Sequence, residues 1–508
     1  MNKNIMCLVN FVRGIEPRMD MDLYEPVQKQ IDLMKQYEMP KTFLLQFDAM
    51  KRADFQKLFI ENKSNELLEI GVWFENCREL IEKIGLEWKG REGYDWDWHV
   101  NVGFLEGYTP TQRERIIDEV FELYKELFGE YPKVAGSWLL DAYSMRYMQE
   151  KYGMKAFCIC REQYAIDAYT LWGGYYSGGY YPSKYNMLCP AQSVENQINV
   201  PVFRMLGIDP IHEYDEMKYS DSHRYRSLGR LTLEPVWTSG QTATTIDWFF
   251  KEYYTNPCLS HSLIITGQEN SFGWENFGKG YVLQIEKIAE YSKQGVFTVE
   301  KLGDIGDEYK RAFTLTPPAA LSALSDWSGK NNKSIWYNSR YYRANLFFHD
   351  GLLFFRDICK FNETYQEEYL HDACWNWCCR YDNLPIVNAL LWSKNGKESG
   401  LFLEKQVENI ALEEKDGKLI VCIDFKEGAK GRIVFDEKKI LFENCETLEY
   451  NCGELEEITT ICNQDKVFRY SHNEFEYSIV IDGNILNKGE IFVMQPIEKE
   501  LRIIIEQE

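Results

Sequence analysis

The chain has 508 residues, and its 57 Lys and Arg against 79 Asp and Glu give a formal net charge of −22. A hydrophobic content of 45% and an aromatic content of 15% are ample for large buried cores, which excludes disorder as the main state. The acidic balance argues against nucleic acid and anionic membranes as partners, because binding phosphate needs concentrated Lys and Arg. A single core stops growing near roughly 250–300 residues, so we expect two or three domains.

The first apolar run, Met6–Val12, ends at Arg13 and has no small-residue cleavage site after it. It predicts a buried strand rather than a secretion signal, and we expect a cytoplasmic protein. No run of 18 apolar residues is present, so no transmembrane helix is expected. The 14 cysteines are scattered, as is typical of reduced thiols. Cys374, Cys378 and Cys379 lack a second Cys/His pair at zinc spacing, and their aromatic neighbours favour core packing over a metal site.

From residue 5 to about 310, short apolar runs alternate with amphipathic helical patterns. The helical pattern at 25–37 has one apolar face, and the pattern at 111–128 has Thr-Pro before it and Gly129 after it. Uninterrupted apolar runs are typical of strands buried on both faces, and seven are present: Met6–Val12, Thr42–Phe47, Glu69–Phe74, Val134–Leu140, Ala156–Cys160, Leu231–Val236 and Leu259–Thr266. This α/β alternation predicts a distorted (β/α)7-type barrel over residues 1–310.

The pattern changes after residue 310. Short strand-like runs follow one another, and no convincing helix is visible after about residue 380. Turn signals of the Asn-Gly and Asp-Gly type separate the runs, at 350–351, 395–396, 416–417 and 482–483. Residues 311–508 are therefore predicted to form an all-β sandwich.

The ends of the predicted strands carry the chemistry expected of a barrel, whose sites lie at the carboxyl ends of its strands. Any single polar residue there is more often a solvated strand end, but nearly every end pairs a charged or amide group with an aromatic ring. Sugar sites need this mixture, because sugar faces stack on rings and hydroxyls bind carboxylates. For His99, a sugar contact and packing within its loop are equally plausible. The predicted binding residues are Glu16, Arg18, Asp48, Trp73, Glu75, Asp97, Trp98, His99, Trp138, Arg161, Glu234, Trp237 and Gln268.

Two further segments are candidates for the walls of such a site. Tyr169–Pro182 is dense in Tyr and Gly, which suits a mobile aromatic loop over the site, although a packing loop explains it almost as well. Trp336 and Tyr337, with the residues from Arg340 to Arg343, could narrow the site from the β-sandwich.

The order of elements over about residues 5–280 resembles polysaccharide deacetylases and glycoside hydrolase families 38 and 57. The resemblance lies in the helix end and strand of Tyr37–Leu45, in Glu69-Ile-Gly71 and in Tyr152–Ala156. Deacetylases carry two metal-binding histidines four residues apart after Glu-Ile-Gly, whereas this chain has Trp73 and Cys77 there. We therefore expect no metal. No GxGxxG motif or phosphate loop is present either, so we expect no cofactor.

The family 57 resemblance implies a nucleophile at strand four and an acid/base at strand seven. By position these are Asp141 and Glu269, with Glu234 as a competitor for either role. Two facing carboxylates without a metal predict a glycoside hydrolase acting on a small glycoside or oligosaccharide. The alternatives are a metal-dependent deacetylase with rearranged ligands, taken from Asp48, Glu75 and His99, and a non-catalytic sugar-binding protein. The sugar, the linkage, the stereochemistry and the oligomeric state, for which a homodimer is one option, stay open.

Overall fold

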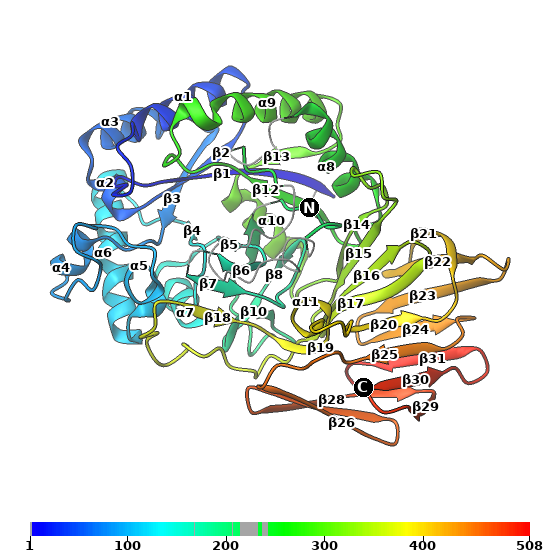
Figure 1. The fold of residues 1–508 in the computed structure, drawn as a ribbon. Coiled ribbons are helices and arrows are strands. Elements are labelled where there is room, and N and C mark those ends of the chain that lie inside the picture. Colours follow the sequence, from blue (N-terminus) through cyan, green and yellow to red (C-terminus); the bar gives the residue numbers. More distant parts are fainter. Residues whose placement is uncertain (1–2, 167, 206, 214–231, 236–241, 508) are drawn as a thin grey trace.

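The computed structural model describes residues 3–166, 168–205, 207–213, 232–235 and 242–507. Its central sheet has nine strands, of which seven parallel ones form the barrel in the order β12-β1-β2-β3-β4-β5-β11. The first and last strands of this order lie next to each other without pairing, so the barrel is nearly closed and the predicted architecture is confirmed (Figure 1). The seven strands are β1 (Asn4–Val12), β2 (Lys41–Leu45), β3 (Leu68–Trp73), β4 (Val134–Gly136), β5 (Ala156–Cys160), β11 (Val202–Met205) and β12 (Ser262–Thr266).

Helices cover the outside of the barrel, as βαβ connections require. The helix α6 begins at Pro110 and ends at Phe128, close to its predicted bounds. A capping box between Thr109 and Gln112 starts it, and Gly129, with a φ of 91°, ends it. The other long helices are α1 (Tyr24–Gln36), α3 (Ala53–Asn62), α7 (Ala142–Tyr152), α8 (Ala243–Thr255), α9 (Trp274–Lys293) and α10 (Leu302–Ala312). The short ones are α2 (Phe47–Lys51), α4 (Arg78–Lys83), α5 (Val100–Gly103) and η1 (Leu105–Gly107).

The sixth barrel strand differs from the prediction. Only 232–235 of the predicted run at 231–236 lie within the described residues, and they hold an isolated bridge from Thr232 to Ile208 rather than a strand. The position beside β5 belongs to β11 instead. Arg204 interrupts the apolar pattern of β11, and its charge is buried against Glu162 at 2.7 Å. Because this strand contains a buried charged residue, the search for apolar runs does not identify it.

The chain after residue 318 forms two packed antiparallel sheets that enclose a shared apolar core. Among the described residues beyond 380, the one helix is the four-residue α11 (Ala389–Trp392), as predicted. One sheet contains β14 (Ala319–Ala323), β15 (Lys333–Asn338), β16 (Tyr342–His349), β17 (Leu352–Lys360), β19 (Leu384–Asn388), β20 (Gly400–Leu403), β25 (Leu448–Asn451), β29 (Asn484–Asn487) and β30 (Ile491–Gln495). The other contains β21 (Val407–Lys415), β22 (Lys418–Phe425), β23 (Lys430–Asp436), β24 (Lys439–Glu443), β26 (Thr459–Gln464), β27 (Val467–His472), β28 (Phe475–Asp482) and β31 (Glu500–Ile504).

The predicted turns are correct at three of four places. The pairs at 350–351, 395–396 and 416–417 have positive φ at both residues, which a tight hairpin turn of this kind requires. Asp482 and Gly483 instead connect β28 to β29, which belong to different sheets. A turn dipeptide marks a change of direction but does not say which strand the chain pairs with next.

A segment of the β-rich half returns to the barrel. The strand β18 (Cys379–Tyr381) pairs in parallel with β7 (Tyr169–Leu171), and Phe361, Tyr369 and Leu370 are buried in the core of the barrel. The division of the chain at 310/311 therefore stays a prediction. Four short strands complete this region: β6 (Gln163–Ile166), β8 (Gly179–Tyr180), β9 (Pro182–Ser183) and β10 (Asn186–Pro190). A further strand, β13 (Thr298–Glu300), pairs with β1.

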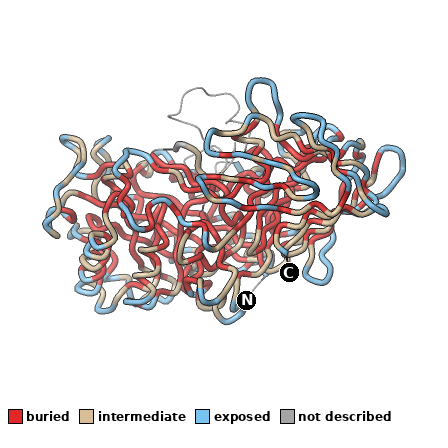
Figure 2. The backbone as a smooth tube through the Cα atoms, turned by 90° about the horizontal axis from the view of Figure 1, so that it is seen from below, coloured by how far each residue is buried: buried red, intermediate tan, exposed pale blue. Residues whose placement is uncertain are grey.

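Both predicted wall segments are interior packing. Trp172, Tyr175 and Tyr176 are buried, so Tyr169–Pro182 is a packing segment rather than a mobile cover. Tyr176 stacks on Trp336 with ring centroids 3.6 Å apart, and Arg343 is fully buried. Figure 2 shows the buried backbone running through both halves, with exposed residues in the loops and hairpins at the rim. No helix within the described ranges combines the length and apolar character needed to cross a membrane.

Candidate active site

A buried arginine lies at the carboxyl end of β1, and three carboxylates surround it. Arg13 is 3% exposed, and its Nη1 donates to Glu16 at 3.2 Å. Its Nη2 donates both to Glu75 at 3.0 Å and to Glu269 at 3.1 Å. Burial alone lowers the pKa of an arginine, but the carboxylates, Glu269 foremost, hold the pKa of Arg13 above its ordinary value. The Arg13 guanidinium thus connects the three segments that follow β1, β3 and β12.

Glu75 is the carboxyl group of this cluster with the most perturbed titration. Burial raises the pKa of Glu75 to about 7; Arg13 opposes the rise, and Glu269 adds to it. Its Oε2 accepts from Gln46 at 2.7 Å as well as from Arg13. Its Oε1 has no partner of normal hydrogen-bond geometry among the described residues, although the indole groups of Trp73 and Trp138 also act on this carboxylate and lower its pKa. Near neutral pH this side chain therefore exists partly as a carboxylic acid.

Glu269 lies opposite Glu75 on the same guanidinium nitrogen. Its Oε2 accepts from Arg13, and its Oε1 accepts from the Ser271 hydroxyl at 2.6 Å. The two Oε2 atoms of Glu75 and Glu269 cannot be further apart than the sum of their distances to Arg13, about 6 Å. Two carboxyl groups within such a distance are the arrangement that glycosidases use across a sugar ring.

Glycines allow the strand ends to approach this closely. A Cβ on Gly267, the residue after β12, would lie 1.6 Å from the backbone oxygen of Val9, so only glycine fits there. A Cβ on Gly14 would lie 2.6 Å from the backbone of Asp48. Both contacts position the chain that carries Arg13 against its neighbours.

Asp48 places a further carboxyl group near Arg13. Burial raises the pKa of Asp48 to about 6, against the effect of the Ala49 backbone N–H and of Arg13. The Ala49 N–H donates to Oδ1 at 2.8 Å, and the backbone N–H groups of Gly14 and Ile15 also favour the charged form of Asp48. The structure thus brings the predicted residues Glu16, Asp48, Glu75 and Glu269 together around one cation.

Two predicted aromatic residues pack below the carboxylates. Trp73 is buried and stacks on Phe11 with ring centroids 4.6 Å apart. The edge of Trp138 approaches Phe11 at 4.9 Å and Trp73 at 5.4 Å. Because Phe11 covers a face of Trp73, this ring supports Glu75 rather than offering a stacking surface. Trp138 is only half-buried and keeps part of its ring accessible.

The loop before α5 covers Arg13 with aromatic rings. The Arg13 guanidinium lies 4.1 Å from the ring centroid of Trp96. Arg18 lies over Trp96 at 4.9 Å and over Trp98 at 5.5 Å, and it also binds Glu16. The Arg18 side chain is 32% exposed, so it is the solvent-facing member of the cluster.

Asp97 anchors this loop instead of facing a substrate. Its carboxylate is fully buried and accepts from Arg91 Nε at 2.8 Å and Nη2 at 3.1 Å. His99 Nδ1 lies 3.1 Å from Asp97 Oδ1. Burial lowers the pKa of His99, against the effect of Asp97. His99 is therefore both packed in its loop and partly exposed at the surface.

A second polar group lies at the ends of β5 and β12. Arg161 is buried between Tyr176, 5.5 Å from its guanidinium, and Tyr253, at 5.8 Å. Gln268 donates to Glu234 at 3.3 Å. Trp237 lies outside the described residues. Gln268 directly precedes Glu269, so the chain connects this group to the Arg13 cluster.

Asp141 belongs to a different cluster, so its predicted pairing with Glu269 needs correction. Its Oδ1 accepts from the Ser144 backbone N–H at 2.9 Å, which caps α7, and from Arg113 at 2.9 Å. Its Oδ2 accepts from the Ser144 hydroxyl at 2.6 Å. The carboxylate is fully buried and shares no partner with Glu269. The strand β4 ends at Gly136, five residues before Asp141, and this is why the position-based prediction failed.

The sequence prediction omitted Arg13, the centre of the cluster, although it directly follows a nine-residue buried strand. Position alone was the available signal, because the first polar residue after a barrel strand is the one nearest the mouth of the barrel. Trp96 had no such signal, because its loop lies far from any strand.

The residues present do not fit the metal site of deacetylases. Trp73 and Cys77 replace the two histidines, and both are buried. Burial holds the pKa of Cys77 well above its ordinary value, which opposes the thiolate that a metal requires. Arg13 already provides the cation between the carboxylates. Among the described residues, no group of three His, Cys, Asp or Glu side chains is arranged to hold a metal ion.

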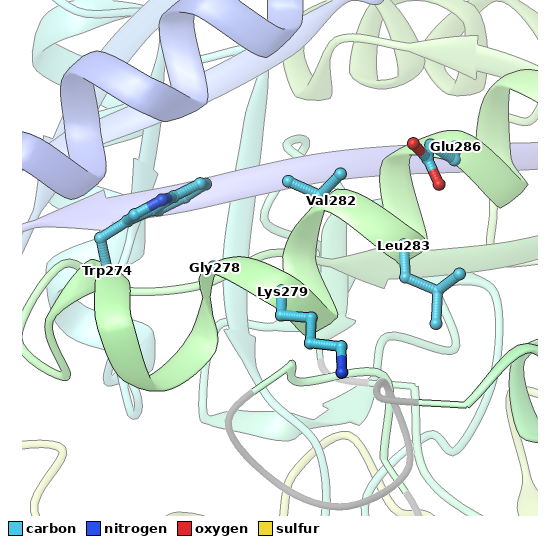
Figure 3. A pocket seen from close by; sticks show the side chains of 6 residues that line it. All are labelled: Trp274, Gly278, Lys279, Val282, Leu283 and Glu286. Carbon is cyan, nitrogen blue, oxygen red and sulfur yellow. The ribbon is translucent and has the colours of Figure 1, made fainter.

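A surface pocket lies elsewhere. It has a volume of about 480 Å³ and lies along α9, lined by Trp274, Gly278, Lys279, Val282, Leu283 and Glu286 (Figure 3). None of the predicted site residues lines it, and Lys279 and Glu286 are its only titratable groups. The Arg13 cluster is therefore the better candidate for chemistry.

A family model matches part of the chain. The model, described as a domain of unknown function with a solved structure (DUF3863), matches residues 97–264. A comparison with curated proteins finds no match.

Solved structures resemble the chain in fold. A protein from Parabacteroides distasonis described as a "putative glycoside hydrolase/deacetylase" has 12% identity, with 77% of this chain and 92% of that chain covered and a TM-score of 0.56. A polysaccharide deacetylase described as putative, from Mycobacterium smegmatis, has 12% identity and a TM-score of 0.38, with 62% of this chain and 92% of that chain covered. A polysaccharide deacetylase described as probable, from Pseudomonas aeruginosa, has 11% identity and a TM-score of 0.37, with 62% of this chain and 93% of that chain covered. The first likeness confirms the resemblance stated from the sequence at the level of the fold.

Proposed function

We propose that this protein is a glycoside hydrolase in which Glu75 and Glu269 are the two catalytic carboxyl groups and no metal takes part. The observation that carries the proposal is that both carboxyl groups bind Nη2 of Arg13 at the carboxyl end of a parallel barrel. We assign no catalytic role to Asp141, because its carboxylate binds Arg113 and accepts from the Ser144 N–H at the start of α7. The fold shared with a structure described as a putative glycoside hydrolase/deacetylase is consistent with this class.

The two carboxyl groups have environments that suit opposite roles. Glu75, whose pKa is raised to about 7 by burial, is the general acid, and its Oε1 protonates the leaving oxygen. Both Glu269 oxygens accept hydrogen bonds, from Arg13 and Ser271, as those of a carboxylate do. Glu269 is therefore the nucleophile that attacks the anomeric carbon.

The separation of the two groups favours retention of configuration. Their Oε2 atoms lie no more than about 6 Å apart, near the ~5–5.5 Å of retaining enzymes and below the ~6.5–9.5 Å of inverting ones. In the first step Glu269 forms a bond to the anomeric carbon as the glycosidic bond breaks and Glu75 protonates the departing oxygen. In the second step Glu75 takes a proton from water, whose oxygen displaces Glu269.

Access to the carboxylates requires a rearrangement at the mouth. Arg13, Glu75 and Glu269 are buried, whereas Arg18 is partly exposed above them and lies over Trp96 and Trp98. A sugar that displaces the Arg18 guanidinium gains these ring faces and the Glu16 carboxylate. Arg13 stays in place, because the backbone N–H and C=O of Arg13 are bound by the Asn270 side chain.

The experiment compares Glu75→Gln and Glu269→Gln with the wild type on a panel of nitrophenyl glycosides. Each variant is expected to lose at least about 10³-fold in kcat. Azide added to Glu269→Ala should yield a glycosyl azide of inverted configuration, which identifies the nucleophile. Glu79→Gln, an exposed carboxylate on α4, is the matched control and should be as active as the wild type. Near-normal turnover by Glu269→Gln, or zinc-dependent release of acetate from acetylated sugars, would overturn the proposal.

A further inference from the structure

Two tryptophans in the loop before β18 are exposed, contrary to expectation. Trp375 and Trp377 are 67% and 69% exposed, the largest fractions among the exposed large hydrophobic side chains of the described residues. The prediction of core packing is correct for Cys374 and Cys379, which are buried, but wrong for Cys378, which is exposed like the two tryptophans. We call Trp375 and Trp377 the outer platform.

The outer platform is held in place by its backbone. The Cys374 N–H donates to the Glu106 carbonyl at 2.7 Å, and the Trp377 carbonyl accepts from the Val100 N–H at 2.9 Å. Burying a large apolar side chain stabilises a fold, and these two tryptophans stay exposed although the backbone of their loop is anchored to the barrel. Exposed apolar side chains on a fixed backbone indicate a surface that binds something.

Each indole is supported on one side by a polar side chain. The His99 ring stacks on Trp377 with centroids 5.0 Å apart and an interplanar angle of 23°. The Lys89 ammonium lies 4.7 Å from the ring centroid of Trp375. The high exposed fractions leave the remaining surface of both rings to solvent. A flat ring, fixed from behind and open in front, suits the apolar face of a sugar.

A continuous series of rings connects the outer platform to the proposed catalytic site. Trp377 contacts His99, whose ring lies 5.8 Å from that of Trp98, and Trp98 lies 5.9 Å from Trp96. Trp96 in turn lies against the Arg13 guanidinium at 4.1 Å. Three rings separate Trp377 from Arg13, so a single sugar bound at Arg13 does not reach the outer platform.

We infer that the outer platform is a sugar-binding subsite, so that the substrate is a saccharide chain extending from Arg13 over Trp98 and His99 to Trp377 and Trp375. This inference rests on the proposed function for its substrate class. A protein partner is disfavoured by size, because two indoles of about 150–250 Å² each fall short of the ~800 Å² per partner of a stable protein interface.

The test measures binding rather than turnover, so that it can be separated from the catalytic proposal. Calorimetry uses the full-length protein with glucose, xylose and N-acetylglucosamine, and with hexasaccharides of β-1,4-linked glucose, xylose or N-acetylglucosamine and of α-1,4-linked glucose. We expect one hexasaccharide to bind more tightly than its monosaccharide. Trp375→Ala and Trp377→Ala should each weaken hexasaccharide binding by about 3–10-fold, with monosaccharide affinity as in the wild type.

Trp377→Phe keeps a smaller ring and should retain part of the gain in affinity that the hexasaccharide shows over the monosaccharide. The control is Leu486→Ala, which removes a 49% exposed apolar side chain on β29 and should bind as the wild type. Unchanged hexasaccharide affinity in the tryptophan variants, or no increase with chain length in any series, would refute the outer platform. Length-dependent binding that needs both tryptophans, without any turnover, would support the platform and refute only the catalytic proposal.

Discussion

Asp141→Asn and Glu269→Gln are expected to have opposite consequences, and the comparison separates a structural carboxylate from a catalytic one. Asp141 is fully buried and pairs with Arg113, which is equally buried. Asn keeps an oxygen that can cap α7, so the cap contributes only tenths of a kcal/mol to the change. The loss of the charge leaves Arg113 without its ion pair, which costs about 3–5 kcal/mol in buried pairs.

Nearby carboxyl groups reduce this cost. Burial and the Asp141 charge together hold the pKa of Glu106 and Glu367 above the ordinary value, so both groups resist ionisation while Asp141 is charged. Without that charge, Glu106 ionises more readily and partly compensates Arg113. We therefore expect a destabilisation of about 2–4 kcal/mol for Asp141→Asn. Glu269→Gln leaves Arg13 with Glu16 and Glu75, so its cost should be near 1 kcal/mol.

The assay combines urea unfolding with kcat on the active glycoside, measured where each variant is fully folded. Asp141→Asn should shift the unfolding midpoint and change kcat less than threefold, while Glu269→Gln should reduce kcat at least about 10³-fold with a small shift. A stable Asp141→Asn protein that has lost its activity would refute the structural role and restore Asp141 as the nucleophile candidate.

Four further predictions concern the same cluster and the strand ends that hold it. With the pKa of Glu75 near 7 as the acid, kcat/KM should decline above about pH 7, and a pH profile that stays flat to pH 9 would contradict this role. Between the ordinary glutamate pKa of 4.5 and the native pKa of about 7, Glu75 binds more protons in the native state than in the unfolded state, so its contribution to stability should fall as pH rises through that window. Glu75→Gln should reduce this dependence of the unfolding free energy on pH, measured by urea titrations. Activity should survive exhaustive chelation, and its loss with recovery on adding zinc would disprove the two-carboxylate mechanism. Gly267→Ala should destabilise the barrel by several kcal/mol, since its Cβ would lie 1.6 Å from the Val9 oxygen. A variant that unfolds in urea at nearly the wild-type midpoint would contradict this close approach.

The barrel was predictable because its strands are buried on both faces and read as uninterrupted apolar runs. The exception, β11, carries Arg204, whose charge is neutralised by Glu162 in the interior. An apolar pattern indicates burial only where polar side chains are absent, so it does not identify a buried strand that contains a paired charge. The return of β18 to the barrel was not predictable either, because local sequence does not encode which distant strand a segment joins.

The meeting of Glu75 and Glu269 at Arg13 follows from their places in the sequence, whereas their catalytic roles stay proposals. Glu75 lies two residues after β3 and Glu269 three residues after β12, so both remain near the carboxyl ends of the strands. Asp141 follows β4 by five residues, enough for the chain to turn into α7 and bury the carboxylate at the helix cap. The exposure of Trp375 and Trp377 had no sequence signal, because a tryptophan in a loop is usually buried.

The charge balance around Arg13 explains why one carboxyl group of the cluster is poised to be an acid. Arg18 binds Glu16 through two nitrogens and matches its charge. This leaves the single charge of Arg13 against Glu75, Glu269 and Asp48, so full ionisation would leave two excess negative charges in a buried site. Burial disfavours these charges, and protons on Glu75 and Asp48 remove them, as the raised pKa values of both groups reflect. A metal ion of charge +2 in the place of Arg13 would instead balance Glu75 and Glu269 and leave no proton on Glu75 to donate. One guanidinium between the two carboxyl groups thus keeps on Glu75 the proton that the proposed mechanism needs.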